Sequence, residues 1–161
     1  NRHQKIFKIP LALFLIVTII VTVMAVNTQF SIAVHLMAGL ANRCEQETTS
    51  GRLAMSVNTS PSFVRRTLAK LSRAGLVETT TGKTGACRLA KAPEQVSLLD
   101  IYRAVDAPKA FAIHAYAPQK PCVVSCNIKA ALEHALAKTQ KAMEKSLADI
   151  TIAEVIADIR Q

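Results

Sequence analysis

Two cysteines, Cys122 and Cys126, lie four residues apart in the stretch PCVVSC, just before a segment with the pattern of a long helix. Thiols at this spacing can bind a metal, form a reversible redox switch, or serve as small apolar side chains. Cys126 is expected just before the first helical turn, where the partial positive charge of the helix end favours a thiolate. Cys122 can act as its resolving partner in a loop, but a bridge within a regular helix would be strained. A reactive pair and a structural pair remain equally open.

The second chemically informative group is cationic. The chain has a formal net charge of +9. Residues 59–91 hold seven basic residues against the single acid Glu78, whereas residues 92–161 hold eight of each sign. Apart from three basic residues within positions 1–23, the excess therefore falls in one short stretch. This distribution predicts a localised surface that binds an anion such as nucleic acid.

Two short helices joined by a tight turn are expected to position these cations. The first has Leu53, Ala54 and Val57 on its apolar face, after an amphipathic helix that begins at Asn27. The second follows from SPSFVRRTLAKLSRAGLV, in which Ser60 is a good N-cap, Pro61 suits the first helical position and Gly75 ends the helix. These signals predict a helix-turn-helix whose second helix is cationic on its outer face, with these residues exposed: Ser62, Arg65, Arg66, Ala69 and Arg73.

A β-hairpin is predicted directly after this helix. The sequence LVETTTGKTGACRLA alternates over residues 76–80 and 86–91, with glycines at the tip between them. A hairpin in this place is a wing, and Lys83 and Arg88 can neutralise DNA phosphates. The simpler interpretation is a solvated basic face. We favour DNA binding because the cap, the proline, the turn, the glycine stop and the hairpin agree.

A long apolar stripe follows in the C-terminal part of the chain. Residues 128–150 carry apolar side chains at helical spacing over a length that the rest of a small fold cannot cover. Burial against a second copy of the chain is therefore expected, through residues 127–150, although packing on its own domain stays open. Residues 97–105 are predicted to form another helix, and residues 107–121 a loop rich in proline and alanine.

Residues 9–26 carry no charge and follow a basic flank. Such a run fits a short membrane span or a signal peptide. The charge bias of a span would export the rest of the chain and place a DNA-binding surface on the wrong side of the membrane. We therefore expect residues 1–23 to lie outside the working fold of a cytoplasmic protein. A membrane is a partner only if this segment is a genuine tether.

The segments SPSFVRRTLAKLSRAGLV, TGKTGACRLAKAPEQVSLLDIYRAVD and ITIAEVIADI, in this order, resemble the Rrf2 family of bacterial winged-helix transcription regulators. The resemblance runs from about Asn27 to Gln161. It implies a homodimer on a palindromic DNA operator, with the second helix in the major groove and the wing toward the minor groove. The DNA-binding positions that it carries over are Thr59, Ser60, Ser62, Arg65, Arg66, Lys70, Lys83 and Arg88. The chain departs from the family at the return of the wing, where Ala86 and Cys87 follow a single glycine.

Relatives that hold an iron-sulfur cluster have three cysteines near the long helix, spaced more widely than the two present here. The chain instead looks like the cluster-free branch, so we expect no cofactor and no metal, with an iron-sulfur cluster as the less favoured alternative. The resulting prediction is a mainly α, winged helix-turn-helix repressor that responds to thiol oxidation or a small ligand. Its parts are residues 1–23, the winged domain 24–106, a loop 107–126 with the cysteines, and the dimerisation and terminal helices 127–161.

Two other functions stay open. One is a thiol-based redox protein using Cys122 and Cys126, which would need a CxxC-like motif in a βαβ setting that the sequence lacks. The other is a winged-helix module that binds protein and has no DNA target. The four histidines are scattered, and no nucleophile elbow, phosphate-binding glycine loop or paired carboxylates are present in the sequence. We therefore expect no catalytic residues and no enzyme activity.

Overall fold

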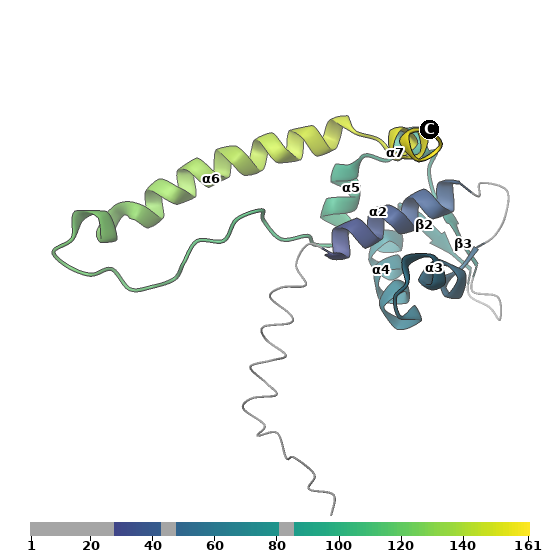
Figure 1. Cartoon of the computed structure of the whole chain (residues 1–161), viewed down its shortest axis with the longest axis horizontal. Helices are drawn as coiled ribbons and strands as arrows, with labels where there is room; N and C mark the ends of the chain where they lie inside the picture. Colours follow the sequence, from purple (N-terminus) through teal and green to yellow (C-terminus); the bar gives the residue numbers. More distant parts are fainter. Residues whose placement is uncertain (1–27, 43–47, 81–85) are drawn as a thin grey trace, which may run out of the picture.

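The computed structural model describes residues 28–42, 48–80 and 86–161 (Figure 1). The predictions for the N-terminal hydrophobic segment and for Lys83 at the wing tip lie outside these residues. Among the residues that the structure describes, no helix combines the length and the apolar character needed to cross a membrane.

The core forms around α2 (Thr28–Ala41). This helix contacts α3 (Ser50–Val57), α4 (Pro61–Arg73), β3 (Ala86–Leu89), α5 (Leu98–Ala104) and α7 (Ile152–Ile159). Its inward face is built from small and medium side chains, and Ala33, Leu36 and Met37 are fully buried. The helix-turn-helix consists of α3 (Ser50–Val57) and α4 (Pro61–Arg73). Both follow the predicted pattern, because Leu53, Ala54, Val64, Leu68 and Leu71 turn into this one core.

The wing is part of a three-stranded antiparallel sheet in the order β1-β3-β2. The two predicted strands are β2 (Val77–Thr79) and β3 (Ala86–Leu89). The added strand is β1 (Thr48–Thr49), in which Thr48 pairs with Cys87 of β3. Two β-branched residues suit such a strand, and β1 covers an edge of β3 that a two-stranded wing would leave unpaired. The predicted mainly α, winged-helix fold is confirmed, and β1 adds a third strand to the predicted two-stranded wing.

The C-terminal helix belongs to the winged domain. The 3-10 helix η1 (Pro93–Gln95) leads into α5 (Leu98–Ala104), and α7 (Ile152–Ile159) packs against α2 and η1. Ile152 is fully buried in the common core. Two backbone hydrogen bonds join the strand-like connections, from Leu98 N–H to Ile150 C=O and from Ile152 N–H to Val96 C=O, both at 2.9 Å. Helix α7 thus packs in the same core as the helix-turn-helix, although the predicted division of the chain grouped it with residues 127–161.

The longest helix, α6 (Val123–Asp149), projects from the domain as an arm (Figure 1). Its 27 residues span about 40 Å. It has no buried residue, and its substantial contact with the described elements is with α5. The helix starts at Val123, four residues before the predicted start at residue 127, so Cys126 lies in its first turns and not in the loop. Residues 107–121, which join α5 to α6, carry no helix or strand, as expected.

Candidate DNA-binding surface

The turn between α3 and α4 fixes the direction of the second helix. Asn58 adopts a left-handed conformation with φ 55° and ends α3. Asparagine tolerates this region better than most residues, which explains its place in the turn. Ser60 then caps α4, because its hydroxyl accepts a hydrogen bond from Phe63 N–H at 3.3 Å. Pro61 occupies the first turn, where its missing N–H costs nothing.

The helix α4 presents its cations outward. Arg65 and Arg66 are exposed, whereas Val64, Thr67 and Leu68 are buried on the other side. The guanidinium of Arg66 lies over the Phe63 ring, with its central carbon 5.8 Å from the ring centroid. The residues predicted from the start and outer face of the recognition helix are therefore brought together on one exposed surface. They are Ser60, Ser62, Arg65 and Arg66, and Thr59, in the turn before them, is half-buried.

Lys70 turns away from that surface, although the sequence placed it in the same group. Its ammonium donates a hydrogen bond to the carbonyl of Val105 at 3.0 Å and lies 3.3 Å from the carboxylate of Asp106. Asp106 adopts a left-handed conformation just beyond the last residue of α5. A cation at the C-terminal end of a helix satisfies free carbonyl groups and interacts favourably with the helix dipole. Contact of Lys70 with a DNA phosphate stays a prediction, and such a contact would have to replace these two interactions.

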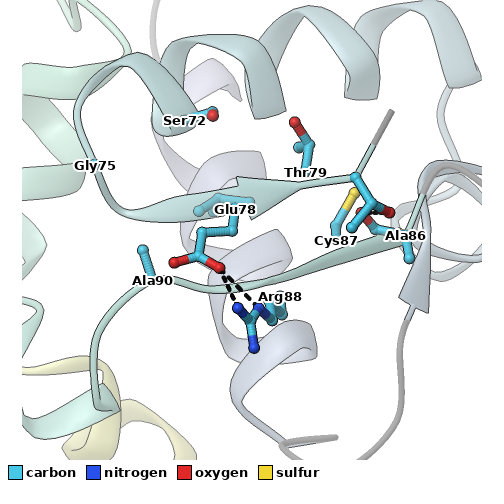
Figure 2. Close-up of a pocket in the computed structure, with 10 residues that line it drawn as sticks. Ser72, Gly75, Glu78, Thr79, Ala86, Cys87, Arg88 and Ala90 are labelled. Atoms are coloured by element: carbon cyan, nitrogen blue, oxygen red, sulfur yellow. Dashed lines mark hydrogen bonds and ion pairs between the residues drawn. The ribbon is translucent and has the colours of Figure 1, made fainter. Parts of the chain in front are cut away.

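Arg88 of the wing is also paired. It lies directly opposite Glu78 in the register of β2 and β3. Its guanidinium donates to the Glu78 carboxylate, with 2.8 Å from Nε to Oε2. Figure 2 shows this pair across the two strands, beside a hollow of about 730 Å³ that Ser72 and Gly75 line from the end of α4. Because the two charges offset each other, Arg88 adds less positive potential to the wing than the sequence indicates.

A third cysteine, Cys87, lines the same hollow. Its side chain is buried, and burial raises the pKa of the Cys87 thiol. A buried neutral thiol behaves as a small apolar side chain. Cys87 therefore serves the packing of β3, which explains a cysteine at the position where the chain departs from the family.

Arg52 is an exposed cation that the sequence alone did not single out. It lies in the first turn of α3, where its backbone N–H donates to the hydroxyl of Thr49 at 3.3 Å. The first helix of a helix-turn-helix crosses the DNA backbone, so a cation at its start is well placed for a phosphate. The position of Arg52 in the first helix could have indicated this role. Arg52 was missed because it lies outside residues 59–91, where the positive charge is concentrated.

The cysteine pair lies at the far end of the arm. Cys122 is the N-cap of α6, and its sulfur accepts a hydrogen bond from Ser125 N–H at 3.4 Å. Cys126 follows one turn later, with its N–H bonded to the carbonyl of Cys122 at 3.1 Å. Both cysteines are exposed. The structure thus places the two predicted sensor residues at the exposed start of one helix.

Among the described residues, the cysteines do not supply the ligands of an iron-sulfur cluster held by one subunit. Such a cluster needs four ligands, commonly thiolates. The start of α6 supplies two thiols, while Cys87 lies in the wing. Within the ranges 28–42, 48–80 and 86–161, no group of three or more Cys, His, Asp and Glu side chains could hold a metal ion.

A helix-turn-helix with a cationic outer face, followed by a small antiparallel wing, defines a winged-helix DNA-binding protein. Residues 26–158 match the model of the Rrf2 family, described as iron-dependent transcriptional regulators. The chain belongs to the Rrf2 family, and the resemblance inferred from the sequence is confirmed.

Known relatives support this assignment. The chain is 34% identical over 132 residues to YwnA of Bacillus subtilis, which is named as an HTH-type transcriptional regulator, and the match covers 81% of this chain and 96% of YwnA. Two solved structures share its fold. IscR of T. potens has 23% identity and a TM-score of 0.62, covering 83% of this chain and 87% of IscR. CymR, described as the global cysteine regulator of B. subtilis, has 21% identity and a TM-score of 0.60, covering 81% of this chain and 95% of CymR.

The ion pair in the wing generates a prediction. Replacing Glu78 with Gln removes a negative charge beside the DNA-binding surface and releases Arg88. We expect the affinity for duplex DNA of random sequence to rise severalfold at low salt, and the slope of log affinity against log salt to steepen by about one. Fluorescence anisotropy titrations over a salt series measure both quantities.

The matched control is Glu94→Gln, which makes the same charge change in η1, outside the wing. It should leave the salt slope as in the unmodified protein. Equal slopes for all three proteins would contradict the idea that Arg88 faces phosphates once it is free.

Proposed function

We propose that this protein is a sequence-specific repressor that binds a palindromic operator as a homodimer. The observation that carries the proposal is the exposed face at the start of α4, where Arg65 and Arg66 stand beside the capped helix end. A recognition helix enters the major groove with its N-terminal residues at the base edges. Either arginine can then make the bidentate contact to guanine that discriminates one base from another.

The remaining predicted contacts fix the position of the protein on the duplex. Thr59, Ser60 and Ser62 surround the N-terminus of α4, where hydroxyl and backbone N–H groups suit a phosphate. Arg88 and Lys83 would contact phosphates from the wing. Such a protein has no catalytic step to perform, and it acts in the cytoplasm, where its DNA target lies.

Dimerisation through α6 is supported by the apolar surface of the arm. Ile128, Leu132 and Leu136 lie on one side of the helix and are only half-buried. At its start, Val123 and Val124 are 75% and 67% exposed. Exposed apolar area costs roughly 25 cal/mol per Å², so a continuous stripe along six turns favours burial against a partner. A second copy provides a matching stripe, and its two-fold symmetry would mirror a palindromic operator.

Thiol oxidation is the signal that the cysteine pair supports best. Cβ atoms four residues apart in a helix lie about 5–6 Å from each other, whereas a disulfide brings them to about 3.5–4.5 Å. A bridge between Cys122 and Cys126 would therefore distort the first turn of α6. Hydrogen peroxide would take two electrons and two protons from the pair and leave as water. Neither this switch nor operator binding requires a cofactor.

DNA recognition is tested by selection from a library of random duplexes, followed by affinity measurements on the enriched sequence. We expect an inverted repeat to emerge. Arg65→Ala or Arg66→Ala should cost about 1–3 kcal/mol on that sequence and relax the base preference at one position of each half-site. Lys138→Ala on the arm removes the same charge as a control. Enrichment of no sequence, or an equal effect of all three substitutions, would contradict the proposal.

The dimer is tested by introducing a carboxylate into the apolar stripe. Leu136→Glu should shift the protein toward the monomer and weaken operator binding at least tenfold, because a buried unpaired charge costs several kcal/mol. His134→Glu introduces the same side chain on the exposed opposite side of α6 and should leave the dimer intact. Sedimentation velocity and anisotropy report the two effects. A monomer in the unmodified protein would rule out this mode of binding.

The thiol switch is tested by measuring operator affinity before and after mild treatment with hydrogen peroxide. The unmodified protein should lose affinity severalfold and regain it with a dithiol reductant, since the change is a reversible two-electron oxidation. The Cys122→Ala, Cys126→Ala variant should bind equally under both conditions. If oxidation left the operator affinity of the unmodified protein unchanged, the thiol switch would be excluded. A visible chromophore in the purified protein would exclude a cluster-free regulator.

A further inference from the structure

The arm is attached to the DNA-binding domain at two places. At its C-terminal end, the backbone bonds between residues 96–98 and 150–152 hold the junction of α6 and α7. The second attachment lies on α5, the element with which α6 makes its substantial contact. Between these two points the helix is continuous. The first point can act as a pivot, so the second decides the angle of the arm.

The second attachment is made of polar side chains. The amide of Gln140 donates to the hydroxyl of Tyr102 at 3.2 Å and to the carboxylate of Glu144 at 2.9 Å. Its oxygen accepts from Ala110 N–H at 3.2 Å. Arg103 lies 3.4 Å from Glu144 and closes the group. We call these four side chains the polar clamp: Tyr102, Arg103, Gln140 and Glu144.

The polar groups of the clamp have hydrogen-bond partners, and contacts with the DNA-binding domain hold Tyr102 in place. Tyr102 donates its own proton to the carbonyl of Pro108 at 2.6 Å, and its ring packs edge-on against Phe30 of α2 at 5.7 Å between centroids. Tyr102 therefore sits in a fixed position relative to the core. The hydrogen bond from Gln140 lowers the pKa of the Glu144 carboxyl, and Arg103 lowers it further, so Glu144 is charged at neutral pH.

The geometry of α6 gives the clamp leverage. Gln140 lies ten residues from Ile150, about 15 Å along the helix, whereas Val123 lies 27 residues away, about 40 Å. A rotation about the pivot that moves Gln140 by about 1 Å therefore moves the start of the arm by nearly 3 Å. Small changes in the clamp become large changes at the end of α6 that carries the cysteines.

The C-terminal end of α5, which carries Tyr102 and Arg103, is also tied to the recognition helix. Lys70 of α4 binds the carbonyl of Val105 and the carboxylate of Asp106, both at the end of α5. Helix α5, seven residues long, thus contacts α4 through Lys70 and α6 through the clamp, both near its C-terminal end. These two sets of polar contacts, together with the packing of Ile101 in the common core, link the recognition helix to the arm.

We propose that the polar clamp, together with Lys70, sets the spacing between the two half-sites that the dimer accepts. The inference rests on the proposed function, because it requires two subunits joined through their arms on a two-part operator. If α6 is the common element of the dimer, then the angle of each domain on its arm fixes the separation of the two recognition helices. The clamp residues are positioning residues that need not touch DNA.

Operator spacing is a sensitive readout of this angle. One additional base pair moves a half-site by about 3.4 Å and rotates it by about 35°. A dimer with rigid arms cannot follow both changes without losing contacts in one half-site. A dimer whose clamp is loosened can swing each domain to meet the new position. Loss of the clamp should therefore relax the spacing preference more than it weakens binding at the preferred spacing.

The test compares a clamp variant with a matched control. The clamp variant is Tyr102→Phe, Gln140→Ala, which removes the central hydrogen bonds and keeps the ring on Phe30. The control is Tyr116→Phe, Gln119→Ala, which makes the same two substitutions in the exposed segment before α6. The probes are the operator selected by the unmodified protein, versions with one base pair added or removed between half-sites, and a single half-site.

For the unmodified protein and the control, we expect a change of one base pair to cost about tenfold or more in affinity. For the clamp variant, we expect a loss of no more than about threefold, with single half-site affinity unchanged within about twofold. Sedimentation should show that the clamp variant is still a dimer.

Three outcomes would overturn the inference: an unchanged spacing penalty in the clamp variant, an equal loss of affinity on every probe including the single half-site, or a monomeric clamp variant. Selection of no two-part sequence by the unmodified protein would instead refute the proposed function, so the two failures are distinguishable.

Discussion

The DNA-binding surface depends on the burial of one face of α4 against the core around α2. Val64 and Leu71 are fully buried and Leu68 nearly so. Burial of each such side chain contributes about 1.5–3 kcal/mol. Because side chains three and four residues apart share a helix face, fixing these three also fixes which residues point outward. A rotation of α4 by one residue would expose the apolar face and turn the arginines toward the core, so packing and recognition constrain the same helix.

Most of this unit could be predicted because its signals are local. Ser60, Pro61 and Gly75 mark the ends of α4 within its own sequence, and the spacing of the leucines marks its buried face. The third strand could not be predicted in the same way. β1 has two residues, and only its pairing with β3, almost forty positions along the chain, makes it a strand. Such non-local pairing leaves no periodic pattern to read. For the same reason, the sequence did not predict that α7 packs against the core around α2.

The arm shows the limit of capping rules. Its apolar stripe predicted a long helix, and the structure has one, but the start lies at Val123 because Cys122 serves as the N-cap. Cysteine is not among the residues usually preferred there, so capping rules did not point to Cys122. The shift changes the chemistry of the pair. Both thiols now belong to one helix end, where a bridge between them would distort the first turn.

The basic residues of the stretch 59–91 also differ in their surroundings, which the composition does not show. Lys70 and Arg88 are each bound to a carboxylate, and those carboxylates come from the segment just after α5 and from the neighbouring strand. Arg65 and Arg66 stay exposed on the outer face of α4. A count of charges cannot separate these groups, because partners across a sheet or between helices are set by the fold. The result is a positive surface concentrated on the outer face of α4, while two further cations hold the surrounding elements in place. Recognition and positioning thus draw on the same type of side chain, and only the partner of each cation distinguishes its role.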